Sequence, residues 1–189
     1  MFNENHHLSK SEIESALQGK DDFVKINYLR RFLERADNLE IKKFVLLNLA
    51  NISEGRNLLK DAVKYIASAG DISVTYREKI EYFMKECELW IKMHEFDMAE
   101  KAFKKAFFYG NSQEKIELDN KYKELFWMTA GIEEKKGRAR HAIKIYERAL
   151  IVNKGRGIEI SEKLISLYEK FGMVKEAEYY REKLELGRE

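Results

Sequence analysis

A short pattern of alanines and bulky residues occurs three times in the sequence and a fourth time in a weaker form. The clear copies are 99–106 (AEKAFKKA), 142–149 (AIKIYERA) and 177–184 (AEYYREKL), and the weaker copy is 62–69 (AVKYIASA). Their first alanines are 37, 43 and 35 residues apart. A unit that recurs at about this period is typical of stacked helical repeats. Such repeats build an extended surface, so the pattern favours a binding protein over an enzyme.

The rest of the sequence predicts helices joined by short connections, with no strand pattern. The chain has no proline and only ten glycines. Ser9 with Glu12 is a capping box that opens a short helix closed by Gly19. We expect the further helices at about 21–36, 39–53, 57–69, 75–93, 96–109, 112–136, 139–152, 158–171 and 173–186. Short connections between helices predict antiparallel neighbours.

The recurring units resemble the tetratricopeptide repeat (TPR) family, in which each unit is a helix pair. The first helix of that family's unit carries a large and then a small residue, and the second carries alanine, an aromatic residue and alanine. The four units here place the following residues at those positions: Leu46, Ala50, Ala62, Ile66 and Ala69; Phe83, Cys87, Ala99, Phe103 and Ala106; Phe126, Ala130, Ala142, Tyr146 and Ala149; and Leu164, Tyr168, Ala177 and Arg181. Arg181 departs from the pattern, because an aromatic residue is expected there.

The resemblance implies an all-α fold, a right-handed superhelical stack of antiparallel helix pairs. We expect residues 1–189 to form a single helical-repeat domain of this kind, a TPR-like α-solenoid. Residues 1–8 are predicted to be a disordered tail, residues 9–36 to form N-terminal capping helices, and residues 37–189 to form about four TPR-like helix pairs. Capping is expected because an end unit must hide its apolar face.

Little in the sequence points to catalysis or to a cofactor. The single cysteine, Cys87, excludes an intramolecular disulfide and a thiolate zinc cluster, and its place in a small-residue position favours buried packing. His6 and His7 lie in a polar tail without a third ligand, and His94 and His141 fall at turns, where we expect them to be exposed. There is no glycine-rich phosphate loop. We therefore expect no enzyme activity, catalytic residue, cofactor or metal site.

The resemblance also implies a binding groove, because the first helices of such pairs line a concave surface that holds a peptide or protein partner. The positions that map to it are Leu47, Asn51, Met84, Glu88, Lys92, Trp127, Glu134, Glu162 and Ser166. One interpretation makes Trp127 an apolar anchor of the groove, and the alternative places Trp127 and Met84 in the core. A subset of the family grips C-terminal carboxylates with lysine and asparagine at these positions. Only Asn51 fits, so that mode is not expected.

A second candidate surface is basic. Its residues are Lys135, Lys136, Arg138, Arg140, Lys144 and Arg148, which we call the basic stripe. Arg140, Lys144 and Arg148 recur every four residues and so share one face of a helix. A run of this kind is either a solvated face or a contact for RNA phosphates or an acidic protein. The net charge of +2, from 35 basic and 33 acidic residues, argues against a dedicated nucleic-acid or membrane binder.

These observations predict a protein–protein interaction scaffold in the cytoplasm, bound to a peptide or protein partner. Residues 1–20 are polar and no apolar run reaches the length of a membrane span, so neither a leader nor an anchor is expected. The alternatives are an RNA-associated adaptor that uses the basic stripe and a self-associating structural subunit. Abundant lysine and glutamate with only two glutamines are shared with hyperthermophile proteins, although an AT-rich genome produces part of the same bias.

Overall fold

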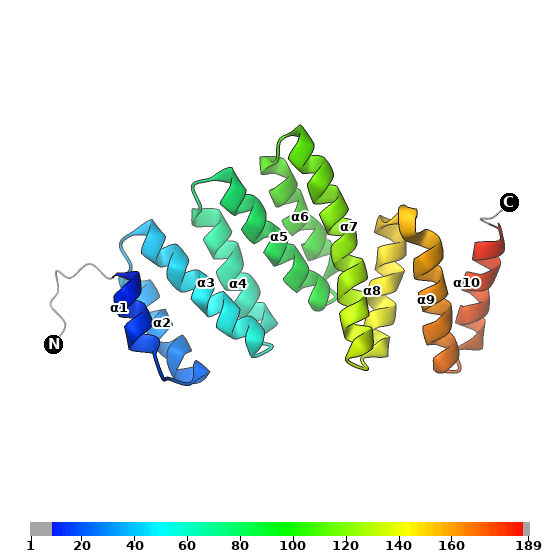
Figure 1. Cartoon of the computed structure of the whole chain (residues 1–189), viewed down its shortest axis with the longest axis horizontal. Helices are drawn as coiled ribbons and strands as arrows, with labels where there is room; N and C mark the ends of the chain where they lie inside the picture. Colours follow the sequence, from blue (N-terminus) through cyan, green and yellow to red (C-terminus); the bar gives the residue numbers. More distant parts are fainter. Residues whose placement is uncertain (1–8, 187–189) are drawn as a thin grey trace. The chain divides into compact units, whose positions relative to one another are not determined.

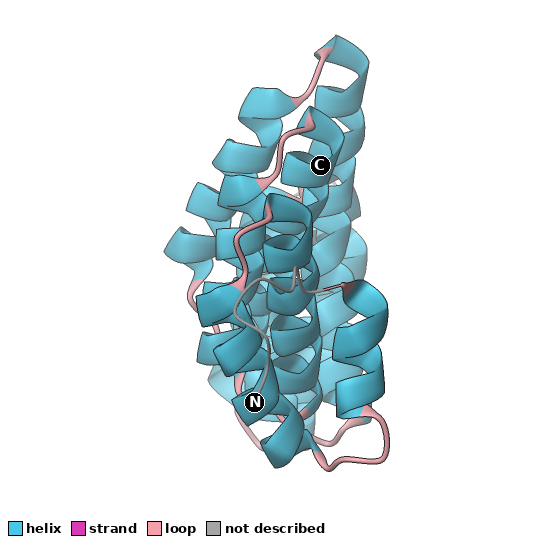
Figure 2. Cartoon of the chain, turned by 90° about the vertical axis from the view of Figure 1, so that its left-hand side faces the viewer, coloured by secondary structure: helices cyan, strands magenta, loops and turns pink. Residues whose placement is uncertain are grey.

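The computed structural model describes residues 9–186, and these form ten α-helices and no β-strand (Figures 1 and 2). The helices are α1 (Lys10–Leu17), α2 (Asp22–Arg35), α3 (Leu39–Gly55), α4 (Leu59–Ile72), α5 (Tyr76–Lys92), α6 (Phe96–Tyr109), α7 (Ser112–Lys135), α8 (Ala139–Val152), α9 (Gly157–Lys170) and α10 (Val174–Leu186). A 3₁₀ turn, η1 (Lys154–Arg156), separates α8 from α9. The all-α prediction is confirmed, and the predicted tail at 1–8 lies outside the described residues.

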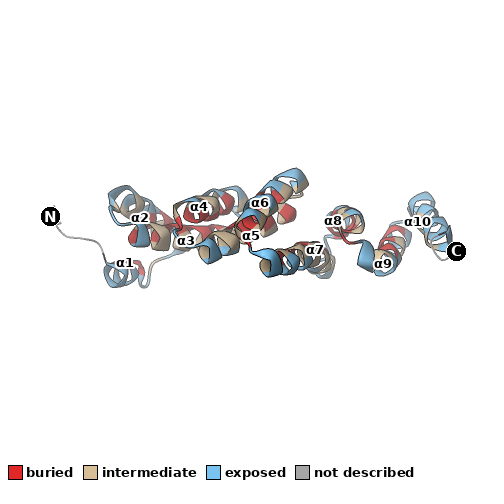
Figure 3. Cartoon of the chain, turned by 90° about the horizontal axis from the view of Figure 1, so that it is seen from above, coloured by how far each residue is buried: buried red, intermediate tan, exposed pale blue. Residues whose placement is uncertain are grey.

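The described chain forms two compact units. The first consists of residues 9–89 and 101–110, and the second of residues 90–100 and 111–186. In the first unit, α3 packs against α2 and α4, and in the second, α8 packs against α7 and α9 while α9 packs against α10. The buried residues of these helices lie where packed neighbours face each other (Figure 3). Each unit is therefore built from sequential antiparallel helices.

The repeated alanines are core residues. Ala62, Ala99, Ala142 and Ala177 each have 0% of their surface exposed. A methyl side chain lets two helix backbones approach closely, which explains why alanine recurs at this position. Cys87 is also fully buried, and burial raises the pKa of its thiol. The predicted packing role of this cysteine is confirmed.

Each of the four helix pairs from α3 to α10 turns at a residue in the left-handed backbone conformation. These residues are Asn57, His94, Gly137 and Gly172, with φ of 59°, 63°, 73° and 69°. Each stands 5 residues before the first alanine of its repeat, so the turns keep the same spacing as the alanines. Glycine adopts this conformation without steric cost, whereas other residues do so rarely. His94 therefore occupies a position that glycine fills in the two later turns.

Side-chain caps confirm the predicted starts of two helices, α1 and α7. Ser9 and Glu12 form a complete capping box at α1, and Asn111 and Glu114 form another at α7. Each box satisfies backbone N–H groups that the first helical turn leaves without a partner. The structure thus confirms that the chain opens α7 directly after Gly110, as the sequence predicts.

Two glycines have a different role from the predicted one. Gly70 was expected to end its helix, but α4 continues to Ile72 and Gly70 lies inside it. A Cβ atom at Gly70 would lie 2.7 Å from Cε1 of the Phe83 ring on α5. This glycine therefore permits a close approach between two helices. The helix expected at 158–171 begins one residue earlier, so Gly157 is the first residue of α9.

Candidate functional site

A cleft of about 430 Å³ lies between α7, α8 and α9 in the second unit. Its lining residues are Glu124, Trp127, Met128, Gly131, Ile132, Glu134, Lys135, Tyr146 and Lys163. Met128 and Ile132 are exposed and Trp127 is half-buried, so one wall of the cleft presents apolar surface to solvent. Gly131 adds no side chain, and a Cβ atom there would meet only the Tyr146 hydroxyl, at 3.8 Å.

Trp127 is held in place by aromatic and cationic neighbours. Its ring centre lies 5.5 Å from that of Tyr146, with the planes at 60°. The guanidinium carbon of Arg156 lies 5.2 Å from the indole centre, within the range of a cation–π contact. Arg156 also forms an ion pair with Glu124 at 3.5 Å. These contacts orient the indole while leaving it partly exposed.

Glu134 is a charged residue of the cleft whose carboxylate is held by two hydrogen bonds. Its carboxylate accepts a hydrogen bond from the Tyr146 hydroxyl at 3.1 Å and another from Nζ of Lys163 at 3.2 Å. Burial raises the pKa of Tyr146, and the nearby Glu134 carboxylate raises it further. The phenol therefore remains a hydrogen-bond donor at neutral pH. Three helices thus contribute to one polar cluster beside the Trp127 wall.

The remaining groove positions are divided between the two units. In the first unit, Leu47 is half-buried and Asn51 is exposed on α3, while Glu88 on α5 pairs with Lys85 at 3.1 Å. Met84 is 2% exposed, so its interpretation as a groove residue is wrong and it belongs to the core. Methionine on a helix face is equally suited to either setting, and its sequence position does not distinguish them.

In the second unit, Lys92 is half-buried near the end of α5, and Glu162 and Ser166 are exposed on α9. None of these three residues lines the cleft beside Trp127. From the predicted groove, only Trp127 and Glu134 are brought together there.

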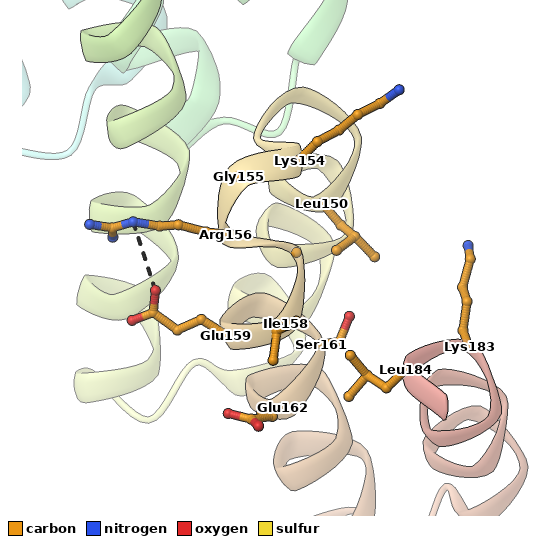
Figure 4. A pocket seen from close by; sticks show the side chains of 11 residues that line it. Leu150, Lys154, Gly155, Arg156, Ile158, Glu159, Ser161, Glu162, Lys183 and Leu184 are labelled. Carbon is orange, nitrogen blue, oxygen red and sulfur yellow. Dashed lines mark ion pairs between the residues drawn. The ribbon is translucent and has the colours of Figure 1, made fainter. Parts of the chain in front are cut away.

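A second cleft, of about 580 Å³, lies between the end of α8, η1, the start of α9 and α10 (Figure 4). Its lining residues are Leu150, Lys154, Gly155, Arg156, Gly157, Ile158, Glu159, Ser161, Glu162, Lys183 and Leu184. Arg156 and Glu159 form an ion pair of 3.8 Å and point to one side, whereas Lys154 and Lys183 extend on the other. Of the predicted groove residues, only Glu162 lines this cleft, because the 3₁₀ turn that shapes it has no clear sequence signal.

Half of the basic stripe is engaged by carboxylates. Lys136 and Arg138 both pair with the buried Glu133, at 3.2 and 3.3 Å. Burial alone would raise the pKa of Glu133, but hydrogen bonds and charge from these two cations outweigh it and lower the pKa. Arg148 pairs with Glu100 at 3.6 Å. These three cations are therefore partly neutralised within the second unit.

The other half of the stripe faces solvent. Lys135, Arg140 and Lys144 are exposed, and within residues 9–186 none of them forms an ion pair. Arg140 and Lys144 lie one helical turn apart on α8, as the sequence predicts. The cations available to an anionic partner are thus fewer than the sequence suggests.

His94 and His141 form a pair that the sequence did not predict. Nε2 of His94 lies 3.1 Å from Nδ1 of His141, and the ring centres are 4.7 Å apart with planes at 82°. Burial lowers the pKa of His94, and the positive charges of His141 and Lys144 lower it further. His94 is half-buried, so the expectation that it is simply exposed is wrong. The two histidines are 47 residues apart in the chain, so no local motif reveals the pair.

No family model matches the sequence. A search of curated proteins also finds no match. Among solved structures, the chain is similar to the crystal structure of BtubC (BKLC) from P. vanneervenii, with 13% identity, a TM-score of 0.43 and coverage of 93% of this chain and 76% of that one. It is also similar to the crystal structure of MamA, with 19% identity, a TM-score of 0.43 and coverage of 94% of each chain.

The class of protein follows from the helices themselves. Their sequential antiparallel pairing, with a recurring buried alanine and a left-handed turn residue, is that of an all-helical paired-helix repeat and is consistent with the TPR resemblance. Within residues 9–186, no helix is both long and apolar enough to cross a membrane.

Proposed function

We propose that the protein is a non-catalytic scaffold that binds a peptide or protein segment in the cleft around Trp127. The observation that carries the proposal is a partly exposed tryptophan fixed at the wall of a cleft. Tryptophan is enriched among the few residues that dominate binding energy, and such residues sit in pockets that exclude water. The compartment, which the sequence predicts to be the cytoplasm, stays a prediction.

The chemistry of the cleft defines the segment that fits it. Met128 and Ile132 extend the apolar wall beside Trp127, so a bulky apolar side chain is the expected anchor. Lys135 is exposed and has no ion pair within residues 9–186, whereas Glu134 is already bonded to Tyr146 and Lys163. An acidic residue flanking the apolar anchor is therefore favoured over a basic one.

The test begins with selection of binding peptides from a displayed library on the full-length protein. Affinities of the selected peptide are then measured by calorimetry for the wild type, Trp127→Ala and Phe23→Ala. Phe23 is a matched control, because it is an exposed aromatic residue on α2 in the other unit. Loss of an aromatic anchor costs about 2 kcal/mol or more, which is roughly 30-fold in affinity. A folded Trp127→Ala variant with unchanged affinity would remove the proposal.

An RNA-associated function is the second candidate, favoured by Lys135, Arg140 and Lys144, three exposed cations that form no ion pair within residues 9–186. If they contact phosphates, RNA affinity should fall with salt, and reversing all three to glutamate should reduce the log–log slope by about 2–3. Folding of the variant is checked by circular dichroism. An absence of RNA binding by the wild type at low salt would exclude this function.

Self-association also stays a prediction. Val174, Tyr179 and Leu186 on α10 are exposed apolar residues of the terminal helix pair. Analytical ultracentrifugation of the wild type over a range of concentrations tests it, and a monomer at all concentrations contradicts it.

A further inference from the structure

The two histidines of the second unit come from separate elements. His94 lies in the turn between α5 and α6, and His141 lies in the first turn of α8. Their nearest ring nitrogens, Nε2 of His94 and Nδ1 of His141, are 3.1 Å apart. The His94 and Phe96 rings are nearly perpendicular, with their centres 6.0 Å apart. The fold therefore brings two imidazoles from different helix pairs into direct contact.

The spacing of these nitrogens is close to that of two imidazoles bound to one metal ion. With metal–nitrogen bonds of about 2.0–2.1 Å and a tetrahedral angle, two ligand nitrogens lie about 3.3 Å apart and their ring centres about 5 Å apart. The observed distances are 3.1 Å and 4.7 Å. The observed and chelate spacings therefore differ by only a few tenths of an ångström, and an ion would replace the hydrogen bond between the two rings.

We propose that His94 and His141 form a two-histidine chelate for a divalent transition-metal ion, bound by Nε2 of His94 and Nδ1 of His141. Imidazole is a good ligand for Zn²⁺, Ni²⁺ and Cu²⁺, whereas Mg²⁺ and Ca²⁺ require oxygen ligands. Within residues 9–186, no group of three or more histidine, cysteine or acidic side chains is placed to hold a metal. Solvent therefore completes the coordination, and Cu²⁺ binds most tightly of the three ions.

The backbone at His94 supports a role for its side chain. His94 has φ of 63°, and the corresponding turns at 137 and 172 use glycine. Non-glycine residues adopt this conformation in only a few per cent of cases, and histidine is among those enriched there, so the turn tolerates His94 without requiring it. Glycine would satisfy the turn, but only a side chain such as histidine can reach His141.

Two features near the pair act on a bound cation. The positive charge of Lys144 opposes it, and the negative charge of Glu133 favours it. Nε2 of His94 is in hydrogen-bond contact with Nδ1 of His141, whereas Nδ1 of His94 has no hydrogen-bond partner within residues 9–186. Nε2 can become the ligand once the proton of the His94 ring lies on Nδ1. A bound ion would join the α5–α6 turn to α8 within the second unit.

The experiment isolates these two histidines. The chain has four histidines, so an untagged full-length protein with His6→Ala and His7→Ala retains only His94 and His141. Zn²⁺ is titrated into this protein by calorimetry, and Cu²⁺ is followed by electron paramagnetic resonance, which reports nitrogen ligands. We expect one ion per chain, two nitrogen ligands and a higher melting temperature with Zn²⁺. The buried Cys87 thiol does not compete.

Single substitutions of His94 or His141, made in the protein that already carries His6→Ala and His7→Ala, test whether each histidine is a ligand. His94→Asn is suited to its turn, because Asn57 has φ of 59° at the equivalent position, and His141→Gln replaces an exposed side chain. Each should weaken Zn²⁺ binding at least about tenfold, because the second ligand no longer acts intramolecularly. His94→Gly is a second variant if His94→Asn does not fold. No saturable binding, or unchanged affinity in either folded variant, would overturn the proposal.

Discussion

Replacing Gly70 by alanine should destabilise the protein, although alanine is the better helix former. In the interior of α4, alanine is favoured over glycine by about 0.5–1 kcal/mol. The added Cβ, however, would lie 2.7 Å from Cε1 of Phe83 and 3.1 Å from Cδ1. Phe83 is 2% exposed and stacks on Tyr109 with ring centres 6.1 Å apart, so its ring has little room to move. Overpacking costs about 1–3 kcal/mol, which leaves a net loss of up to about 2.5 kcal/mol.

The assay is urea unfolding at 25 °C, with stability compared at an unchanged denaturant slope. Gly131→Ala is the matched control, because Gly131 is also inside a helix but its added Cβ would meet only the Tyr146 hydroxyl, at 3.8 Å. The control should gain up to about 1 kcal/mol. In a double variant, Phe83→Leu should remove most of the Gly70→Ala penalty, because contacting sites are not additive. A Gly70→Ala protein as stable as the wild type would refute the packing argument.

Three further outcomes are expected. Ala142→Leu should lower the free energy of unfolding by about 1–3 kcal/mol in urea, because Ala142 is fully buried between helices. The hydrogen bond from Lys43 lowers the pKa of Glu78 below 4.5 in the folded state, so its stabilisation is present above that pH and lost as pH falls through the folded pKa. Glu78→Gln should therefore flatten stability against pH in this acidic range, and an unchanged profile would contradict it. Gly131→Ala should also weaken peptide binding at the cleft, measured by calorimetry, without loss of stability.

The helix pairs were predictable because a buried alanine recurs in the sequence once per pair. The alanines at 62, 99, 142 and 177 are all fully buried, and burial of a small residue at a close helix contact leaves a recurring mark in the sequence. The bounds of α6 and α8 follow from the sequence for the same reason. Gly70 was misread because glycine both ends helices and permits close packing. Which role applies depends on Phe83, a residue of another helix.

The candidate cleft was predictable only in part. Trp127 and Glu134 were placed on one surface through the resemblance, and the structure puts both at the same cleft. The contacts that define the cleft are long-range: Lys163 reaches Glu134 across 29 residues, and Arg156 covers Trp127. The assignment of Met84 to the groove was wrong because Met84 is buried. An apolar residue near the edge of the apolar face of a helix can lie in the core or at the surface, and the sequence pattern does not distinguish the two. Periodicity identifies helix faces, but the neighbouring helix decides whether a face is covered.

The histidine pair shows how a structural repeat can reveal a residue that no motif marks. His94 occupies the turn position held by Asn57, Gly137 and Gly172, and the left-handed φ values show that this position has the same conformation in all four turns. In three of the turns this position is glycine or asparagine, the residues best suited to the left-handed conformation. At the fourth the residue is a histidine whose ring contacts His141. The turn does not require histidine, so substitution of His94 tests whether its side chain has the proposed role apart from the fold.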